Sequence, residues 1–164
     1  MKRYILDANN IAHRHPGLRG VITATPESLA TAFMGLLAPY AQRYPSYHFT
    51  VVFDGASGRT LGVPRSVTVV SAAKHQAADD VIRELIRSES APASCIVVSS
   101  DTEVYNFARA HSCTAMTADV FLREIAPVAD PAVKTGKGSG GHGEKPSGVS
   151  RAELAIMKKL FGLE

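Results

Sequence analysis

The chain has 164 residues and a net charge of +3, and 45% of its residues are hydrophobic while 20% are charged. These values are typical of one globular domain and exclude an intrinsically disordered chain. No apolar run approaches the roughly 20 residues that span a bilayer, and no signal peptide is visible, so we expect a cytoplasmic protein without a membrane partner. The spacing of Cys95 and Cys113 fits neither a metal site nor a disulfide framework, which agrees with a reducing compartment.

Short apolar runs predict five strands, at residues 4–6, 47–53, 67–71, 95–99 and 114–117. Helical spacing of apolar residues predicts helices at residues 26–43 and 77–88, from residue 101 onward, and at 119–125. Residues 13–20 are expected to form a loop or a short helical turn, and residues 56–64 a loop. Because strands and helices alternate, the pattern predicts a mainly parallel α/β sheet.

Two of these helices begin with clear capping signals. Thr25 is the expected N-cap of the first, with a proline at the first helical position and an acid in the first turn. Ser100 and Glu103 have the spacing of a capping box, which predicts Ser100 as the N-cap of the helix after the fourth strand.

The composition changes after residue 130. The expected folded domain is therefore residues 1–130, followed by a flexible glycine-rich linker at 131–149. Residues 150–164 predict a C-terminal helix with Ser150 as its N-cap.

Three of the predicted strands are followed at once, or after one residue, by an acid: Asp7, Asp54 and Asp101. The carboxyl ends of parallel strands meet at one edge of a sheet, where such sheets bind their ligands. Each acid alone could be an ordinary helix cap or turn residue. Together they predict a group of carboxylates at that edge.

The helix at 77–88 offers a fourth acid. On a helical wheel, Asp79 lies about 90° from the centre of the apolar stripe, whereas Asp80 lies nearly opposite the stripe. Asp79 is therefore the expected member of the acid group, and Asp80 is expected to face solvent.

Clustered carboxylates repel one another unless a cation or a shared proton relieves the repulsion. Carboxylate oxygens suit Mg²⁺ or Mn²⁺, which also bridge to phosphate oxygens. A metal held in this way supports the hydrolysis of a phosphodiester bond.

Basic residues in the predicted loops would suit a phosphate-rich partner. We expect them at the same edge as the acids, where they could bind an RNA backbone without reading its sequence. Taken singly, each could equally be a solvated surface charge. They are Arg14, Arg19, Arg59, Arg65 and Lys74.

Four short segments, in their order and spacing, resemble the NYN domain in its YacP-like branch. They are residues 5–11 (Ile-Leu-Asp-Ala-Asn-Asn-Ile), 52–54 (Val-Phe-Asp), 78–82 (Ala-Asp-Asp-Val-Ile) and 97–101 (Val-Val-Ser-Ser-Asp). The resemblance implies a PIN-like fold, with helices in three α/β/α layers around a central, mainly parallel sheet. The family usually opens with Asp-Gly-Tyr-Asn, and here Ala8 and Asn9 occupy the two middle positions.

The resemblance further implies a divalent-metal-dependent endoribonuclease. Its metal ligands would be Asp7, Asp79 and Asp101, around Mg²⁺ or Mn²⁺, and the supporting catalytic residues would be Asn10 and Asp54. RNA is the expected partner, whether free or on the ribosome.

Two alternatives stay open from the sequence. One is an RNA- or ribosome-binding adaptor that uses the same fold without catalysis. The other is a metal-dependent phosphatase, although Asn9 stands where one such class has the second acid of an Asp-x-Asp pair.

Overall fold

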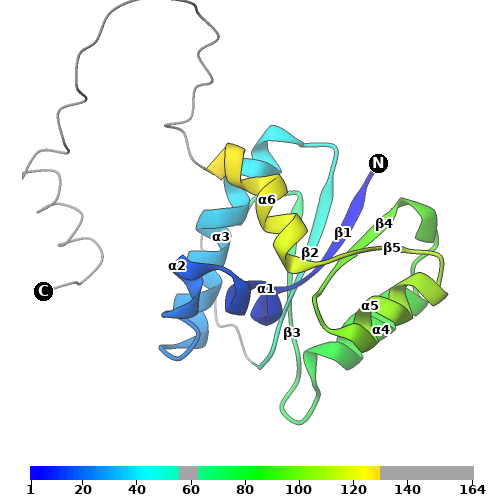
Figure 1. Ribbon diagram of the computed structural model, residues 1–164, viewed down its shortest axis with the longest axis horizontal. Helices are drawn as coiled ribbons and strands as arrows, with labels where there is room; N and C mark the ends of the chain where they lie inside the picture. The colour runs from blue at the N-terminus through cyan, green and yellow to red at the C-terminus, as the bar shows by residue number, and fades with distance from the viewer. Residues whose placement is uncertain (56–62, 130–164) are drawn as a thin grey trace, which may run out of the picture. The chain divides into compact units, whose positions relative to one another are not determined.

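The computed structural model describes residues 1–55 and 63–129, which Figure 1 shows as a ribbon coloured along the chain. The predicted linker at 131–149 and the predicted helix at 150–164 lie outside the described residues, as does Arg59. No helix among the described residues is long and apolar enough to cross a membrane.

A five-stranded sheet forms the centre of the domain, and all of its strands are parallel, as predicted. The strand order is β3-β2-β1-β4-β5. The strands are β1 (Arg3–Asp7), β2 (His48–Phe53), β3 (Val67–Ser71), β4 (Cys95–Val98) and β5 (Thr114–Met116). Because β1 lies between β2 and β4, the strand order reverses beside β1, which is where open sheets of this kind bind ligands.

In the described part of the chain, six α-helices connect and follow the strands. They are α1 (Ala8–Arg14), α2 (Pro16–Arg19), α3 (Pro26–Arg43), α4 (Ala78–Arg87), α5 (Thr102–Ala110) and α6 (Ala118–Ala129), and a 3₁₀ turn covers Pro92–Ser94. Thr25 caps α3 by accepting a hydrogen bond from the backbone N–H of Ser28, as predicted.

The prediction of a loop or a short helical turn at residues 13–20 is confirmed, because α2 is a single short helical turn. The preceding helix α1 begins directly after Asp7, in a segment for which we predicted no helix. One local prediction was wrong. The N-cap of α5 is Asp101 and not Ser100, since the Asp101 carboxylate accepts the backbone N–H groups of Glu103 and Val104.

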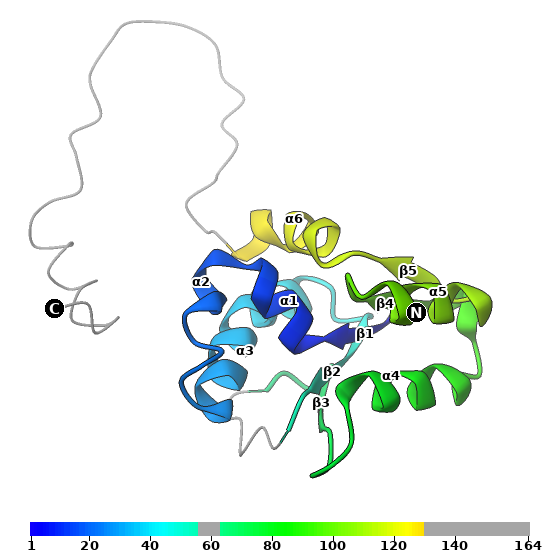
Figure 2. The same cartoon turned by 60° about the horizontal axis from the view of Figure 1, so that its bottom comes forward.

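The helices cover both faces of the sheet, in the predicted α/β/α layers. Side chains from α1, α3 and α6 pack on one face, and side chains from α4 and α5 pack on the other. Figure 2 shows α3 and α4 on opposite sides of the strands.

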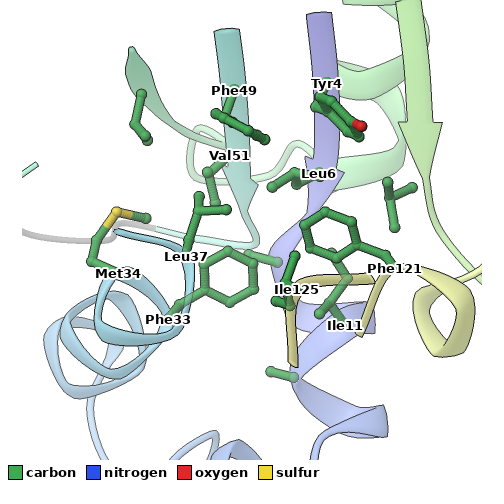
Figure 3. Packing of buried hydrophobic residues seen from close by; sticks show 14 of the residues in the cluster. Tyr4, Leu6, Ile11, Phe33, Met34, Leu37, Phe49, Val51, Phe121 and Ile125 are labelled. Atoms are coloured by element: carbon green, nitrogen blue, oxygen red, sulfur yellow. The ribbon is translucent and has the colours of Figure 1, made fainter. Parts of the chain in front are cut away.

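The central strands are buried on both faces, and their side chains alternate between the two cores. Tyr4 and Leu6 of β1 face the α1, α3 and α6 side, whereas Ile5 between them belongs to the other core. In Figure 3, Leu6 lies close to Phe121 of α6, and Phe33 of α3 points toward the strands. This packing holds the carboxyl end of β1 rigidly between two layers of helices.

Candidate active site

Asp7 closes β1 and is only 5% exposed. Its carboxylate is the N-cap of α1, where Oδ1 accepts the backbone N–H of Asn10 at 3.2 Å. Its Oδ2 accepts the hydroxyl hydrogen of Ser99 at 3.0 Å. Asp7 is therefore a helix cap, and it also lies at the point where the strand order reverses.

The surroundings of Asp7 disfavour its charged form. Burial raises the pKa of Asp7 from 3.8 to about 6, although the hydrogen bonds from Asn10 and Ser99 act in the opposite direction. The negative charges of Asp79 and Asp101 raise the pKa of Asp7 further. The three acids that the resemblance singles out thus lie close enough to act on one another.

Asp101 begins α5 beside Asp7, to which it is connected through Ser99. The Ser99 hydroxyl donates to Asp7 and accepts the backbone N–H of Asp101 at 3.1 Å. Asp101 Oδ1 accepts the N–H groups of Glu103 and Val104 at 2.9 and 3.0 Å, and Oδ2 takes part in neither bond. Asp101 thus combines a fixed orientation with one oxygen outside these capping bonds.

Ser99 is a site residue that the sequence reading did not single out. It is 1% exposed and bridges two acids that are far apart in the sequence. The sequence does place a hydroxyl at the end of an otherwise apolar strand. A buried polar side chain needs a hydrogen-bond partner, so this position could have been predicted to contact another polar group.

Asp79 lies in the first turn of α4 and is partly buried. Burial raises its pKa, the charge of Asp101 adds to this effect, and the guanidinium of Arg83 opposes it. Asp80 is instead exposed and forms an ion pair with Arg83 at 3.5 Å. The helical-wheel prediction that Asp79 lies at the margin of the core face and that Asp80 faces solvent is confirmed.

Asn10 connects the first helix to the loop after β4. Its Oδ1 accepts the backbone N–H of Ser100 at 2.8 Å, while the Ser100 hydroxyl accepts the N–H of Ala118 at 3.1 Å. A chain of hydrogen bonds therefore runs from α1 through the β4–α5 turn to the start of α6. It fixes the segments that carry Asp7 and Asp101 relative to each other.

Asp54 follows β2 at the same edge but is held differently. It is exposed, and its backbone N–H donates to Oδ1 of Asn9 at 2.9 Å. Asn9, which departs from the family's usual opening, thus anchors the backbone of Asp54 to α1.

Two of the predicted RNA-binding cations lie on the first helices and have local partners. Arg14 at the end of α1 forms an ion pair with Asp119 at 3.5 Å, and both side chains are 52% exposed. Arg19 at the end of α2 is exposed, and its Nε donates to the carbonyl of His13 at 3.0 Å. These contacts leave both residues accessible.

The prediction that all the basic residues share the acids' edge was wrong for Arg65. Arg65 precedes β3, and the neighbouring Ser66 accepts a hydrogen bond from Phe49 near the start of β2. Since β2 and β3 are parallel, the chain must return to the amino edge before β3 begins. Lys74 follows β3, so it lies exposed at the carboxyl edge.

The acid group suits a divalent cation in charge and chemistry. Among the described residues, Asp7, Asp79 and Asp101 have no ion-pair partner. No three His, Cys, Asp or Glu side chains in the described part of the chain are placed to hold one ion together. Mg²⁺ usually keeps several waters and takes only one or two protein carboxylates. The residues present therefore fit a hydrated ion.

Comparison with known proteins gives solved structures of similar fold and a family match. Two crystal structures of Rae1 (YacP) from Bacillus subtilis are similar in fold. One has a TM-score of 0.64 and 21% identity, covering 78% of this chain and 75% of that chain. The other, a tryptophan-to-leucine mutant, has a TM-score of 0.63 and 20% identity, covering 77% of this chain and 76% of that chain.

These similarities support the predicted PIN-like fold. The comparison with curated proteins gives no match. The sequence pattern of the YacP-like NYN domain matches residues 4–160, which is nearly the whole chain. The protein therefore belongs to the family of YacP-like NYN domains.

Proposed function

We propose that this protein is an endoribonuclease that depends on Mg²⁺ or Mn²⁺. Membership in the YacP-like NYN family supports a nuclease-type function related to RNA. The observation that carries the finer proposal is the buried carboxylate of Asp7, which has Asp79 and Asp101 as neighbours and no cationic partner among the described residues. A divalent cation would relieve the repulsion between these carboxylates beside β1, where the strand order of the sheet reverses.

Asp7, Asp79 and Asp101 would hold the ion, directly or through its waters. When bound, such an ion supplies a nucleophilic water and neutralises the charge that develops on the phosphodiester. Asp7 and Asp101 are held by backbone N–H groups and by Ser99, so their carboxylates need little reorganisation. Asn10 keeps the β4–α5 turn in place.

The cations at the carboxyl edge would hold the RNA backbone near these acids. Arg14, Arg19 and Lys74 are exposed and contact no carboxylate of the acid group. Their role would be to bind phosphates and to position the scissile bond, and it carries no sequence preference. Cytoplasmic localisation and association with the ribosome belong to the same proposal.

The decisive test compares the purified full chain with its Asp7→Asn variant, using a structured RNA and Mn²⁺ with and without chelator. We expect chelator-sensitive internal cleavage by the wild type and a loss of more than about 100-fold in the variant, since even residues that only orient metal ligands contribute 10–100-fold. Circular dichroism controls for folding. Full activity of a folded Asp7→Asn protein would contradict the assignment.

A second candidate function is favoured by one observation. No ready-made group of three metal-binding side chains exists among the described residues, which also suits an RNA-binding adaptor without catalysis. In the same experiment, an adaptor would bind RNA in the presence of chelator and cleave nothing with either metal.

A further inference from the structure

A small pocket lies at the carboxyl edge of the sheet, next to the acid group but distinct from it. It is formed where β2 ends, between the first turn of α1 and the beginning of α3, and its volume is about 90 Å³. Its main lining residues are Asn9, Ile22, Thr25, Leu29, Phe53 and Asp54. The pocket is far smaller than the roughly 300 Å³ or more of typical small-molecule sites, so it suits the planar edge of one base rather than a whole nucleotide.

The lining combines apolar walls with a polar rim. Ile22, Leu29 and Phe53 supply apolar surface, and Phe53 and Leu29 belong to the buried core, so these walls are rigid. None of the described lining residues is cationic, and Asp54 is acidic. A phosphate group would therefore be repelled, whereas an uncharged ring with polar edges would be accepted.

Only part of the polar rim is available to a ligand. The Thr25 hydroxyl already accepts the N–H of Ser28 at 3.1 Å and contacts the Ser28 hydroxyl at 2.7 Å. Asn9 Oδ1 accepts the N–H of Asp54 at 2.9 Å, which orients the carboxamide so that its NH₂ group is the donor left for other partners. The rim thus presents one amide donor next to one carboxylate acceptor.

This pair of groups complements one nucleobase best. Guanine carries an acceptor, O6, beside two adjacent donors, N1–H and N2–H₂. Its O6 would take the Asn9 amide hydrogen, and its two donors would bind the Asp54 carboxylate as a charge-assisted pair. Adenine, cytosine and uracil each offer only one donor group on this edge, so they make one bond fewer to the carboxylate.

The location suits a substrate contact. Asn9 lies two residues after Asp7 in the chain, on the helix that Asp7 caps, so a base in the pocket would lie within a short span of the acid group. Sequence-specific recognition of RNA generally uses unstacked bases that are held on their Watson–Crick edges.

We propose that this pocket binds a nucleobase of single-stranded RNA and selects guanine through Asn9 and Asp54. The proposal rests on the proposed function, because it assigns a base preference to the same RNA substrate. It gives Asp54 the role of a specificity-determining residue and Asn9 the role of its partner.

Binding of short RNAs to the full chain tests this without relying on cleavage. The probes are uridine hexamers that carry guanosine, inosine or adenosine at one central position, measured by fluorescence anisotropy with Ca²⁺ present. Inosine lacks the N2 amino group. We expect the guanosine hexamer to bind about tenfold more tightly than the adenosine and the inosine hexamers, because adenine and hypoxanthine each offer the carboxylate only one donor group.

Asp54→Asn is the test variant, because Asp54 is exposed and its structural bond uses only the backbone, so the fold should persist. We expect the preference for guanosine to fall to less than about threefold in this variant. The matched control is Glu84→Gln, which removes the same charge from an exposed acid on α4 and should leave the preference unchanged.

The outcomes separate the two proposals. Equal binding of all hexamers by the wild type, or an unchanged preference in Asp54→Asn, would overturn the guanine pocket even if the protein cleaves RNA. A guanine preference that depends on Asp54, in a protein that cleaves nothing with Mn²⁺, would support the pocket and reject the nuclease.

Discussion

The two edges of the sheet each hold a carboxylate with little exposed surface, and the neighbours of these two carboxylates have opposite charges. At the amino edge, the Glu89 side chain is 5% exposed and pairs with Arg3 at 2.9 Å, and it also accepts the backbone N–H of Ala91. At the carboxyl edge, Asp7 is buried, but its charged neighbours are the acids Asp79 and Asp101. Glu89 is partly buried as a residue although its side chain is little exposed, so the main difference between the two acids lies in charge compensation.

This contrast distinguishes an acid with a structural role, Glu89, from a candidate functional acid, Asp7. An acid that pairs with a cation of the same chain has its charge compensated within the fold, as Arg3 compensates Glu89. A buried acid surrounded by other acids is destabilising unless something outside the chain compensates it, and such groups gather at functional sites. Mutations and pH changes that alter the charge compensation of Asp7 or of Glu89 test this difference.

The largest effect is expected for the free energy of unfolding as a function of pH, to which the titration of Asp7 should contribute. The measurement is made with chelator present. Because its pKa is raised in the folded state, Asp7 stabilises the fold below pH 3.8, and this contribution is lost as the pH rises through about 6. The difference corresponds to about 3 kcal/mol.

The Asp7→Asn variant lacks this titration. Its unfolding free energy relative to wild type should therefore rise by up to about 3 kcal/mol between pH 4 and pH 7, measured by urea denaturation. Added Mn²⁺ should stabilise the wild type at pH 7 and not the variant. Parallel pH profiles of the two proteins would show that folding leaves the pKa of Asp7 unchanged, which would contradict this prediction.

Ser99→Ala should have the next largest effect, because it removes the bridge between two acids without changing any charge. We expect cleavage to fall about 10–100-fold, as for residues that orient metal ligands. The Ser99 hydrogen bond lowers the pKa of Asp7, so its loss should raise that pKa. The acidic limb of the pH–rate profile should therefore move to higher pH. Ser94→Ala, at an exposed serine near the amino edge, is the control.

Arg3→Ala should have the smallest effect and should act on stability alone. It leaves the Glu89 carboxylate with little compensation, but Arg3 is 44% exposed, so we expect a loss of about 1–2 kcal/mol rather than the cost of a fully buried pair. Thermal unfolding and RNA cleavage would be measured together. A drop in the cleavage rate of the folded variant would show that the two edges are not independent.

Local sequence patterns predicted the elements of this fold well. The strand at 67–71 and the helix at 26–43 have the expected bounds, because alternating burial and helical spacing depend only on near neighbours. The choice of Asp79 over Asp80 followed from the same periodicity. The N-cap of α5 was missed because two local signals competed there, since either Ser100 or Asp101 could have capped the helix.

The sequence by itself determined which residues are strand, helix and strand-end acid, since periodicity and capping act over a few residues. Only the tertiary structure decided that β1 lies beside β4, and hence that Ser99 bonds to Asp7 across 92 residues. It also decided that Asn9 anchors Asp54 and that Arg65 lies at the opposite edge. Such contacts depend on strand order and crossovers, which local patterns do not encode.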